Sequence, residues 1–396
     1  MSSPPYLSPG RIGNLHLRNR LIRAATSETM CTVEGDVTDD LVTLYENLAK
    51  GGAGLLITGH AYVEPRGQCS DRQIGIYSDC QVDGLKRLTD AVHSQGGRIF
   101  AELSHAGSQC GMAHIEPVAP SAARNDIFGT AARALTAQEI DELIVAFAEA
   151  ARRAIKAGFD GIHIHGGNGY LISQFSSPYT NRRTDEWGGD AARRNRFIVE
   201  VYSAIRLAVG PDIPISARYG IADAITGGLE MKEGIDRAVL LRQAGIDAIE
   251  VSFGIMDSYL SNIRPYVGLT LGRAVSDWVL PWLWRKPSAE AYYLPFAAAL
   301  RRASDVPIIL VGGVRSTNAM AAALDSGNVE FLSFARPFVR EPDFPNQLMA
   351  GRTGVVDCVS CNICLEHDGY DALKCWRKNA GSLAAHALWK IQRAAR

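Results

Sequence analysis

The sequence predicts an α/β protein, a (β/α)8 TIM barrel with a short cysteine-containing C-terminal extension. Two observations predict this fold. Short apolar, β-branched runs recur eight times, each followed by Gly or polar residues and then by a helical pattern. Four of these runs are approached by a helix that ends in Gly, as a left-handed helix cap requires: KGGAGLLI, KAGFDGIHI, QAGIDAIEV and DSGNVEFLSF. Eight similar units favour a closed barrel over an open sheet.

The eight expected strands are, in chain order, 21–26, 54–60, 98–105, 161–167, 214–220, 248–254, 307–313 and 331–338. A doubly wound sheet is the alternative fold, and it usually carries a glycine-rich phosphate turn after its first strand. The sequence RAATSE stands at that place and contains no glycine. We therefore expect one barrel over residues 1–350 and a tail over residues 351–396.

Composition favours a small-molecule partner. The chain has 396 residues, of which 47% are hydrophobic, and its 41 Lys and Arg residues nearly balance 42 Asp and Glu residues. Such a balance gives no electrostatic reason to expect nucleic acid or an anionic membrane as partner. The N-terminus lacks an apolar leader segment, and no window reaches the roughly 18 apolar residues of a membrane span. We therefore expect a cytoplasmic protein.

Polar residues gather where the expected strands end, which is where barrels of this type carry out chemistry. The segment 163–175, HIHGGNGYLISQF, is the richest of these strand ends. It is either a surface loop closed by flexible glycines or one wall of a shared pocket. The strand-end residues are Thr26, Gly59, Glu102, His105, His165, Arg218, Ser252, Gly312, Gly313 and Arg336. Their common location favours the pocket.

Seven segments resemble, in order and spacing, the Old Yellow Enzyme group of FMN-dependent oxidoreductases, from about residue 7 to residue 350. They are NRLIRAATSE, KGGAGLLITGHAYV, ELSHAG, GFDGIHIHGGNGYLISQFSSPYTNRRTDEWGG, SARYG, LVGGVRS and FARPF. The tail motif CVSCNIC with a later Cys resembles the branch that includes 2,4-dienoyl-CoA reductase and trimethylamine dehydrogenase.

The resemblance implies three catalytic and substrate-binding residues. His165 and Asn168 would grip the carbonyl oxygen of an enone-like substrate and stabilise the negative charge that develops there. Tyr170 would protonate the α-carbon, because a phenol with a pKa near 10 keeps its proton at neutral pH. His163 has the same direction along the strand but lies one layer deeper, so we interpret it as structural.

The resemblance also implies an FMN site. Ala25 and Thr26 would lie against the flavin ring, and Arg218 would stabilise the anionic reduced flavin at its N1 and O2 edge. Phosphate binding is expected after the seventh and eighth strands. The complete expected set is Ala25, Thr26, Gly59, Glu102, Arg218, Gly312, Gly313, Ala335 and Arg336. Ala335 stands where the family commonly has Gly.

Glu102 departs from the family pattern, in which Gln is usual. A Gln amide can both donate to flavin O2 and accept from N3–H, whereas an ionised carboxylate can only accept. Either Glu102 is protonated, or it accepts from N3–H alone and opposes charge on the reduced ring. We predict a lower flavin reduction potential than in a Glu102→Gln variant.

The cysteines of the tail predict a metal centre. Cys358, Cys361 and Cys364 form CxxCxxC, and Cys375 follows after ten residues. Soft thiolates at this spacing, together with the resemblance, favour a 4Fe-4S cluster; zinc or four free thiols are the alternatives. The other four cysteines are scattered, which favours a reduced compartment over a disulfide framework.

The sequence thus predicts an FMN-dependent oxidoreductase of the ene-reductase type, which passes hydride from NAD(P)H to an activated C=C bond. One alternative is an FMN/4Fe-4S dehydrogenase of an amine or alicyclic substrate. Another is an electron-transfer or redox-sensing flavoprotein without turnover. Expected partners are a small-molecule substrate, a protein electron donor or acceptor, and further copies of the chain. The aromatic segment 256–300 is a lid, a subunit contact or helix packing.

Overall fold

The computed structural model describes residues 3–125, 129–254 and 290–394. Parallel strands close into a barrel, because the order β10-β11-β12-β13-β14-β3-β4-β6 is completed by pairing of β6 with β10. These strands are β3 (Leu21–Arg23), β4 (Leu55–Ile57), β6 (Ile99–Ser104), β10 (Gly161–Gly166), β11 (Ile215–Gly220), β12 (Ala248–Ser252), β13 (Ile308–Val311) and β14 (Phe331–Phe334). The predicted (β/α)8 barrel and its eight strands are confirmed.

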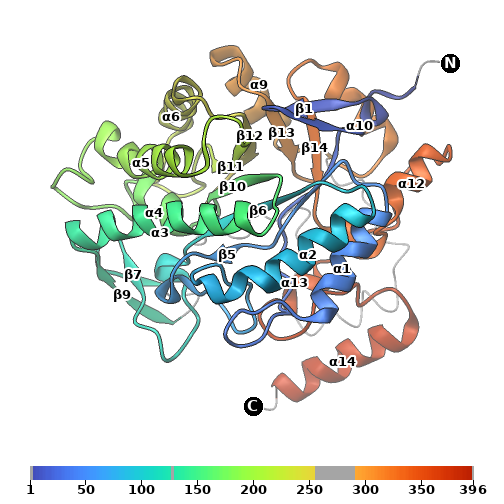
Figure 1. The fold of residues 1–396 in the computed structure, drawn as a ribbon, viewed down its shortest axis with the longest axis horizontal. Coiled ribbons are helices and arrows are strands. Elements are labelled where there is room, and N and C mark those ends of the chain that lie inside the picture. The colour runs from blue at the N-terminus through green and yellow to red at the C-terminus, as the bar shows by residue number, and fades with distance from the viewer. Residues whose placement is uncertain (1–2, 126–128, 255–289, 395–396) are drawn as a thin grey trace.

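Helices surround this barrel (Figure 1). The longer ones are α1 (Asp39–Lys50), α2 (Val82–Ser94), α3 (Ala137–Lys156), α5 (Ala191–Val209), α6 (Met231–Ala244), α9 (Leu294–Ala303) and α10 (Thr317–Asp325). Short helices are α4 (Leu171–Ser176), α11 (Arg336–Arg340) and α12 (Phe344–Met349), with 3-10 turns η1 (Pro5–Leu7), η2 (Pro65–Gly67), η3 (Asp79–Gln81) and η4 (Gly107–Gln109). None of the helices in the described ranges is both long and apolar enough to span a membrane.

The glycines at the four helix ends adopt the left-handed conformation that the sequence predicts. Their φ angles are +94° at Gly52, +91° at Gly158, +101° at Gly245 and +69° at Gly327. A side chain is disfavoured in this region, which explains why Gly stands at each turn into the next strand.

An N-terminal hairpin, β1 (Gly10–Ile12) paired with β2 (Leu15–Leu17), closes the barrel at the end where the strands begin. Ile12 and Leu17 are buried in one apolar cluster with Leu55 and Phe331, the first residues of β4 and β14. Burial of this plug excludes water from that end and leaves the opposite end for a ligand.

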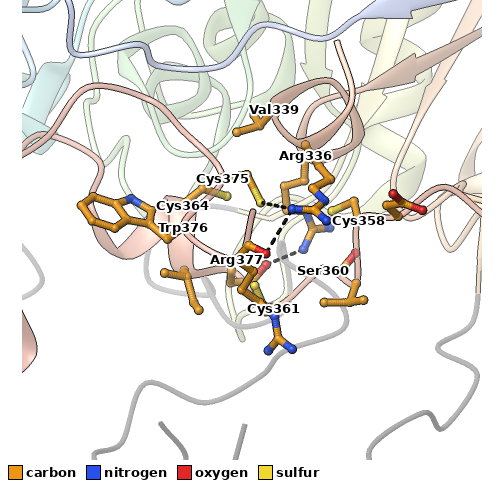
Figure 2. Close-up of a pocket in the computed structure, with 14 residues that line it drawn as sticks. Arg336, Val339, Cys358, Ser360, Cys361, Cys364, Cys375, Trp376 and Arg377 are labelled. Atoms are coloured by element: carbon orange, nitrogen blue, oxygen red, sulfur yellow. Dashed lines mark hydrogen bonds between the residues drawn. The ribbon is translucent and has the colours of Figure 1, made fainter. Parts of the chain in front are cut away.

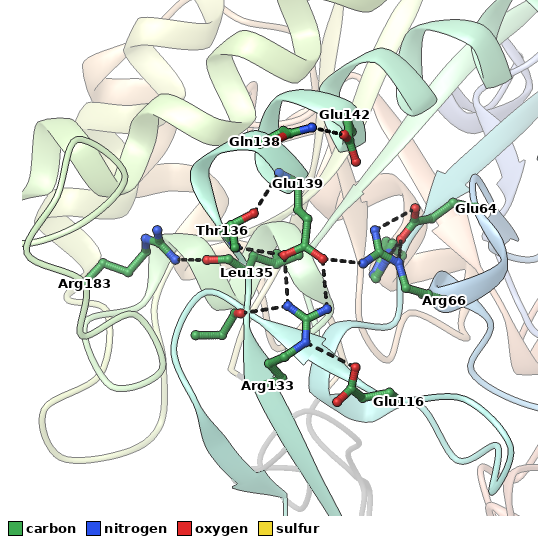
Figure 3. Close-up of polar contacts among 12 residues, drawn as sticks. Glu64, Arg66, Glu116, Arg133, Leu135, Thr136, Gln138, Glu139, Glu142 and Arg183 are labelled. Carbon is green, nitrogen blue, oxygen red and sulfur yellow. Dashed lines mark hydrogen bonds and ion pairs between the residues drawn. The ribbon is translucent and has the colours of Figure 1, made fainter.

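A small additional sheet follows β6 in the chain. It consists of β7 (Val118–Ala119), β8 (Ala123–Asn125) and β9 (Thr130–Ala134), while β5 (Ala61–Tyr62) pairs with β6. Glu139, at the start of α3, binds Arg133 and Arg66, each at 2.8 Å (Figure 3). Arg66 also contacts Glu64 at 3.1 Å, which in turn accepts from the buried ring of His105 at 2.9 Å.

We expect Glu139→Gln to destabilise the protein by about 1–2 kcal/mol at neutral pH, because it breaks the ion pairs and part of the helix cap. The Arg133 guanidinium and the Thr136 N–H hold the pKa of Glu139 well below its usual value. The contribution is therefore complete above the unfolded-state pKa of about 4.3 and is lost as the pH falls below it. Thermal melting at pH 7 and near pH 4 should show a difference that shrinks in acid.

Glu142→Gln is the matched control, because Glu142 lies on the same helix and its carboxylate accepts only from Gln138 among the described side chains. It should leave the melting temperature nearly unchanged at both pH values. An equal effect of Glu139→Gln at pH 7 and pH 4 would contradict the charge-based account.

The tail returns to the barrel after α12. Its helices are α13 (Ile363–Glu366) and α14 (Ala380–Ala394), and α14 lies at the edge of the molecule in Figure 1. The Leu373 N–H donates to Glu28 O at 2.9 Å, and the Gly369 N–H donates to Thr29 Oγ1 at 3.2 Å. These bonds hold residues 369–373 against the loop that follows β3. That residues 351–396 are a unit separate from the barrel stays a prediction.

Candidate active site

A cavity of about 310 Å³ lies at the ends of the barrel strands, opposite the hairpin plug. Eleven of the twelve residues predicted for catalysis, substrate and FMN line it: Ala25, Thr26, Glu102, His165, Asn168, Tyr170, Arg218, Gly312, Gly313, Ala335 and Arg336. The structure does not place Gly59 in this wall. Its N–H donates to the buried carboxylate of Glu28 at 2.9 Å, and the next residue, His60, lines the cavity instead.

The end of β10 and the turn after it bring two hydrogen-bonding side chains, His165 and Asn168, to the cavity. The Nδ1 atom of His165 lies 3.5 Å from Glu102 Oε1, so its Nε2 edge is left for a ligand. Asn168 adopts a left-handed φ of +55°, which Asn tolerates better than most residues. Its Oδ1 accepts from Ser252 Oγ at 2.7 Å, which leaves the Nδ2 group to donate. His163 is fully buried and pairs with Ser216 at 2.8 Å, which agrees with its structural interpretation.

Tyr170 stands beside this pair, at the position preceding α4. Its ring lies 4.4 Å from that of His165, and its hydroxyl donates to Cys69 Sγ at 3.6 Å. Burial, followed by the neighbouring Cys69, raises the pKa of Tyr170 well above its usual value. The phenol therefore keeps its proton throughout the neutral and mildly alkaline range.

The positive charge of Arg218, on β11, is balanced by the buried carboxylate of Glu250. Its Nε donates to Glu250 Oε2 at 2.6 Å, and both residues come from neighbouring parallel strands. Burial would raise the pKa of Glu250, but Arg218 and His163 together outweigh burial and lower this pKa, so the carboxylate is ionised. Burial and Arg218 together lower the pKa of His165, so its ring is neutral. A protonated Glu102 facing Nδ1 leaves the ring proton on Nε2, which is then the donor.

Glu102 is buried and lacks a hydrogen bond at one oxygen. Within the described residues, Oε1 has no hydrogen-bond partner, and the His165 and His163 rings lie 3.5 and 3.8 Å away. Burial raises the pKa of Glu102 to about 8, although Arg218 opposes this shift. A carboxyl group that is protonated at neutral pH can donate as well as accept, as a Gln amide does. Burial therefore favours a protonated Glu102 over an ionised one at neutral pH. The difference in flavin reduction potential from a Glu102→Gln variant is then expected only at alkaline pH.

We therefore expect the flavin potentials of the wild-type protein and a Glu102→Gln variant to agree below about pH 7. Above about pH 8, Glu102 ionises, and its charge disfavours the anionic reduced flavin. An added charge at this range is worth about 1–4 kcal/mol, or on the order of 20–90 mV for a two-electron couple. Spectroelectrochemical titration from pH 6 to 9 measures the difference. A difference that does not change with pH would contradict protonation of Glu102.

The opposite end of the cavity is suited to a phosphate group. Gly312 and Gly313 follow β13 with φ angles of +113° and +80°, a region that favours Gly. A Cβ atom on Gly312 would come within 2.8 Å of the Tyr293 ring, so this turn has no room for a side chain. Arg336, the first residue of α11, lines the same end and bonds to Asn362 of the tail. Backbone N–H groups and a cation in this position are typical phosphate ligands.

Sequence reasoning missed His60 and the part of the tail that lines the cavity. His60 immediately follows Gly59, so its signal was a polar residue one place beyond the expected strand-end contact. Asp368 and the tail residues Ser360, Cys364, Leu365 and Leu373 also line the cavity, and no local pattern indicated this. The predicted aromatic segment 256–300 lies outside the described residues as far as residue 289, but Tyr292 and Tyr293 belong to the wall.

The four tail cysteines surround a neighbouring cavity of about 200 Å³ (Figure 2). Cys358, Cys361, Cys364 and Cys375 all line it, and none of them forms a disulfide. In the described parts of the chain, no three His, Cys, Asp or Glu side chains converge closely enough to hold a metal ion. Cys364 lines both this cavity and the larger one, so the two share a wall.

Comparison with known proteins agrees with this geometry. The "NADH oxidase" of Thermoanaerobacter brockii is 36% identical over 91% of this chain, which spans about half (53%) of that protein's length. The structure of a 2-naphthoyl-CoA reductase complex matches 96% of this chain and 58% of its own, with a TM-score of 0.83 and 27% identity. An old yellow enzyme homologue from Zymomonas mobilis matches 90% of this chain and 96% of its own, with a TM-score of 0.71 and 28% identity.

These matches confirm the resemblance to the Old Yellow Enzyme group of FMN-dependent oxidoreductases. The model of the NADH:flavin oxidoreductase / NADH oxidase family matches residues 6–354, which is nearly the whole barrel and the first residues of the tail. The chain therefore belongs to the NADH:flavin oxidoreductase / NADH oxidase family.

Proposed function

We propose that this protein reduces the activated C=C bond of an enone-like substrate at the expense of NAD(P)H, with FMN as its resident cofactor. The observation that carries the proposal is the convergence of two N–H donors and one protonated phenol, from His165, Asn168 and Tyr170, on a single cavity. A ketone oxygen needs donors, and the carbon next to it needs a proton. One strand end supplies both.

The residues around the cavity fit FMN. Among the described residues, one buried oxygen of Glu102 has no hydrogen-bond partner, and Arg218, two strands away in the barrel order, is a permanent cation. Together they offer a donor, an acceptor and a positive charge to the pyrimidine edge of a flavin. Gly312, Gly313 and Arg336 would hold the phosphate. When bound, FMN supplies the ability to accept hydride from a nicotinamide and to give it up to a carbon atom.

The protein residues contribute binding, orientation and one proton. His165 and Asn168 donate to the carbonyl oxygen of the substrate and stabilise the charge that grows there as its β-carbon gains hydride. The hydroxyl of Tyr170 gives its proton to the α-carbon, and solvent restores it. Ser252 Oγ donates to the Asn168 amide oxygen, which leaves the Nδ2 group to face the substrate.

Anaerobic reduction of the purified yellow protein tests this proposal. NADH or NADPH should bleach the flavin absorbance within seconds, and simple amines should leave it unchanged. Bleaching by an amine alone would favour a dehydrogenase instead. Reduction only by a protein donor, with no turnover of small molecules, would favour the electron-transfer or redox-sensing flavoprotein.

A second candidate, an FMN/4Fe-4S dehydrogenase of an amine or alicyclic substrate that passes electrons to a protein, is favoured by one observation. Cys364 and Ser360 line both the large cavity and the cysteine cavity. A cluster held by the four thiolates would therefore lie beside the proposed flavin site, on a direct path for electrons. The same cluster also fits the leading proposal, as an entry point for electrons from a protein donor.

We expect anaerobically purified protein to contain about four iron and four acid-labile sulfide per chain. Cys364→Ser should lose most of both. Cys80→Ser is the matched control, because Cys80 is exposed and lies outside the tail. About one zinc per chain, or no bound metal, would contradict the cluster. Metal analysis and the visible spectrum give the answer together.

We also place the protein in the cytoplasm. All eight cysteines lack disulfide bonds, which supports a reduced compartment. Assembly into a homo-oligomer stays a prediction, which analytical ultracentrifugation of the purified protein tests.

A further inference from the structure

His60 lies in the wall of the large cavity, and the catalytic scheme above gives it no role. Its ring stacks near that of His165, with centroids 6.1 Å apart and an interplanar angle of 25°. The ring of Tyr170 is 5.2 Å away. The three side chains therefore surround the same part of the cavity, where the activating group of the substrate would lie.

Gln73 determines which nitrogen of His60 carries a proton. Gln73 Oε1 accepts from the Cys69 N–H at 2.6 Å, and Gln73 Nε2 donates to His60 O at 2.7 Å. A backbone N–H can only donate and a backbone carbonyl can only accept, so these two bonds fix the orientation of the amide. The second hydrogen of Nε2 then points to His60 Nδ1, also at 2.7 Å. Nδ1 is an acceptor, and in the neutral ring the proton is on Nε2.

The ring is neutral, and its N–H edge is available. Burial, together with the nearby Arg218 charge, lowers the pKa of His60 to about 4. Gln73 does not line the cavity, so the Nδ1 edge faces away from it and the Nε2 edge is left to line it. No residue in the described ranges forms a hydrogen bond with Nε2. His60 thus offers one fixed N–H donor to a ligand.

A simple ketone has no acceptor position left for this third donor. A carbonyl oxygen has two lone pairs, and His165 and Asn168 supply two donors for them. We propose that His60 binds a second acceptor atom of the substrate, so that the site prefers alkenes whose activating group carries two oxygens, as nitro and carboxyl groups do, over simple enones. This inference rests on the proposed function, because it assumes that His165 and Asn168 hold the first oxygen.

Equilibrium binding to the oxidised holoprotein tests the inference without turnover. The ligands are 1-nitrocyclohexene and cyclohex-2-enone, which share a ring, carry no charge and differ in the number of acceptor oxygens. Dissociation constants come from the change in flavin absorbance, measured anaerobically and without a nicotinamide. For His60→Ala we expect the ratio of nitroalkene to enone affinity to fall about tenfold, as the loss of one hydrogen bond implies.

Two further variants separate donation from packing. His60→Gln keeps an N–H donor and should restore most of the nitroalkene preference. Gln73→Leu removes the bond that fixes the ring, and ¹⁵N NMR of histidine-labelled protein should show His60 changing from a pure Nε2–H tautomer to a mixture. The inference is overturned if His60→Ala weakens both ligands equally or neither, if His60→Gln behaves as His60→Ala does, or if the wild-type ring carries its proton on Nδ1.

Failure of this inference can be told from failure of the proposed function. If the wild-type protein reduces the enone but the affinity ratio does not depend on His60, only the role of His60 is wrong. If the ratio depends on His60 but neither ligand is reduced by protein that NAD(P)H has bleached, the donor site stands and the proposed reaction is wrong.

Discussion

Tyr170→Phe is expected to slow reoxidation of the reduced protein by an enone about 10²- to 10⁴-fold, the usual contribution of a positioned general acid. Reduction by NAD(P)H should stay nearly intact, because the phenol takes no part in that step. In the free protein the hydroxyl contacts Cys69 Sγ at 3.6 Å, and the Tyr170 ring lies 4.4 Å from that of His165. Since burial raises the pKa of Tyr170, its ionisation should not reduce the rate below about pH 10.

Stopped-flow absorbance measures the two half-reactions separately. Tyr77→Phe is the matched control, because Tyr77 stacks on Tyr62 outside the cavity wall. It should change neither rate. An unchanged reoxidation rate in Tyr170→Phe, or an equal loss in both half-reactions, would remove Tyr170 from its proposed role.

His165→Ala is expected to lower the rate of enone reduction about 10²- to 10³-fold, the loss typical of one donor to a developing oxyanion. Asn168→Ala should have an effect of similar size. If both donate to the same oxygen, their effects are coupled, and the double variant should lose less than the product of the two single losses. The Asn168 amide oxygen accepts from Ser252 Oγ at 2.7 Å, so the Nδ2 group is the part of Asn168 that can donate to the same oxygen as His165.

Rates of reoxidation for the two single variants and the double variant complete the cycle. His114→Ala serves as the surface control, since His114 is exposed and should be silent. Fully multiplicative losses would show that the two side chains act on different atoms, and a loss below about threefold in either single variant would show that it does not stabilise the oxyanion.

The barrel could be predicted because its signals are local. Each strand is a short apolar run, and the turns at Gly52, Gly158, Gly245 and Gly327 need a left-handed residue whatever lies around them. The hairpin plug β1–β2 and the addition β7–β9 could not be predicted, since their strands (GRI, LHL, VA, ARN and TAARA) lack the longer apolar runs of the barrel strands. Their stability comes from distant partners, such as Phe331 for the plug.

Site residues at strand ends could be predicted from the sequence. Site residues that reach the cavity through the packing of irregular segments could not. Glu102, His165 and Arg218 lie near the ends of regular strands, so their position follows from the count along the chain. Between β4 and β5 the chain is irregular, and this is why His60 lines the cavity in place of Gly59. The protonation of Glu102 depends on burial, and the approach of Asp368 depends on how the tail folds back.

Product analysis after a single anaerobic turnover shows whether the protein reduces an activated C=C bond. Protein first reduced with one equivalent of NAD(P)H is mixed with one equivalent of cyclohex-2-enone, and both the flavin absorbance and the products are followed. We expect full return of the yellow absorbance together with one equivalent of cyclohexanone per flavin. If the flavin stays reduced, or if its absorbance returns without any saturated ketone, the protein does not reduce activated C=C bonds at this site.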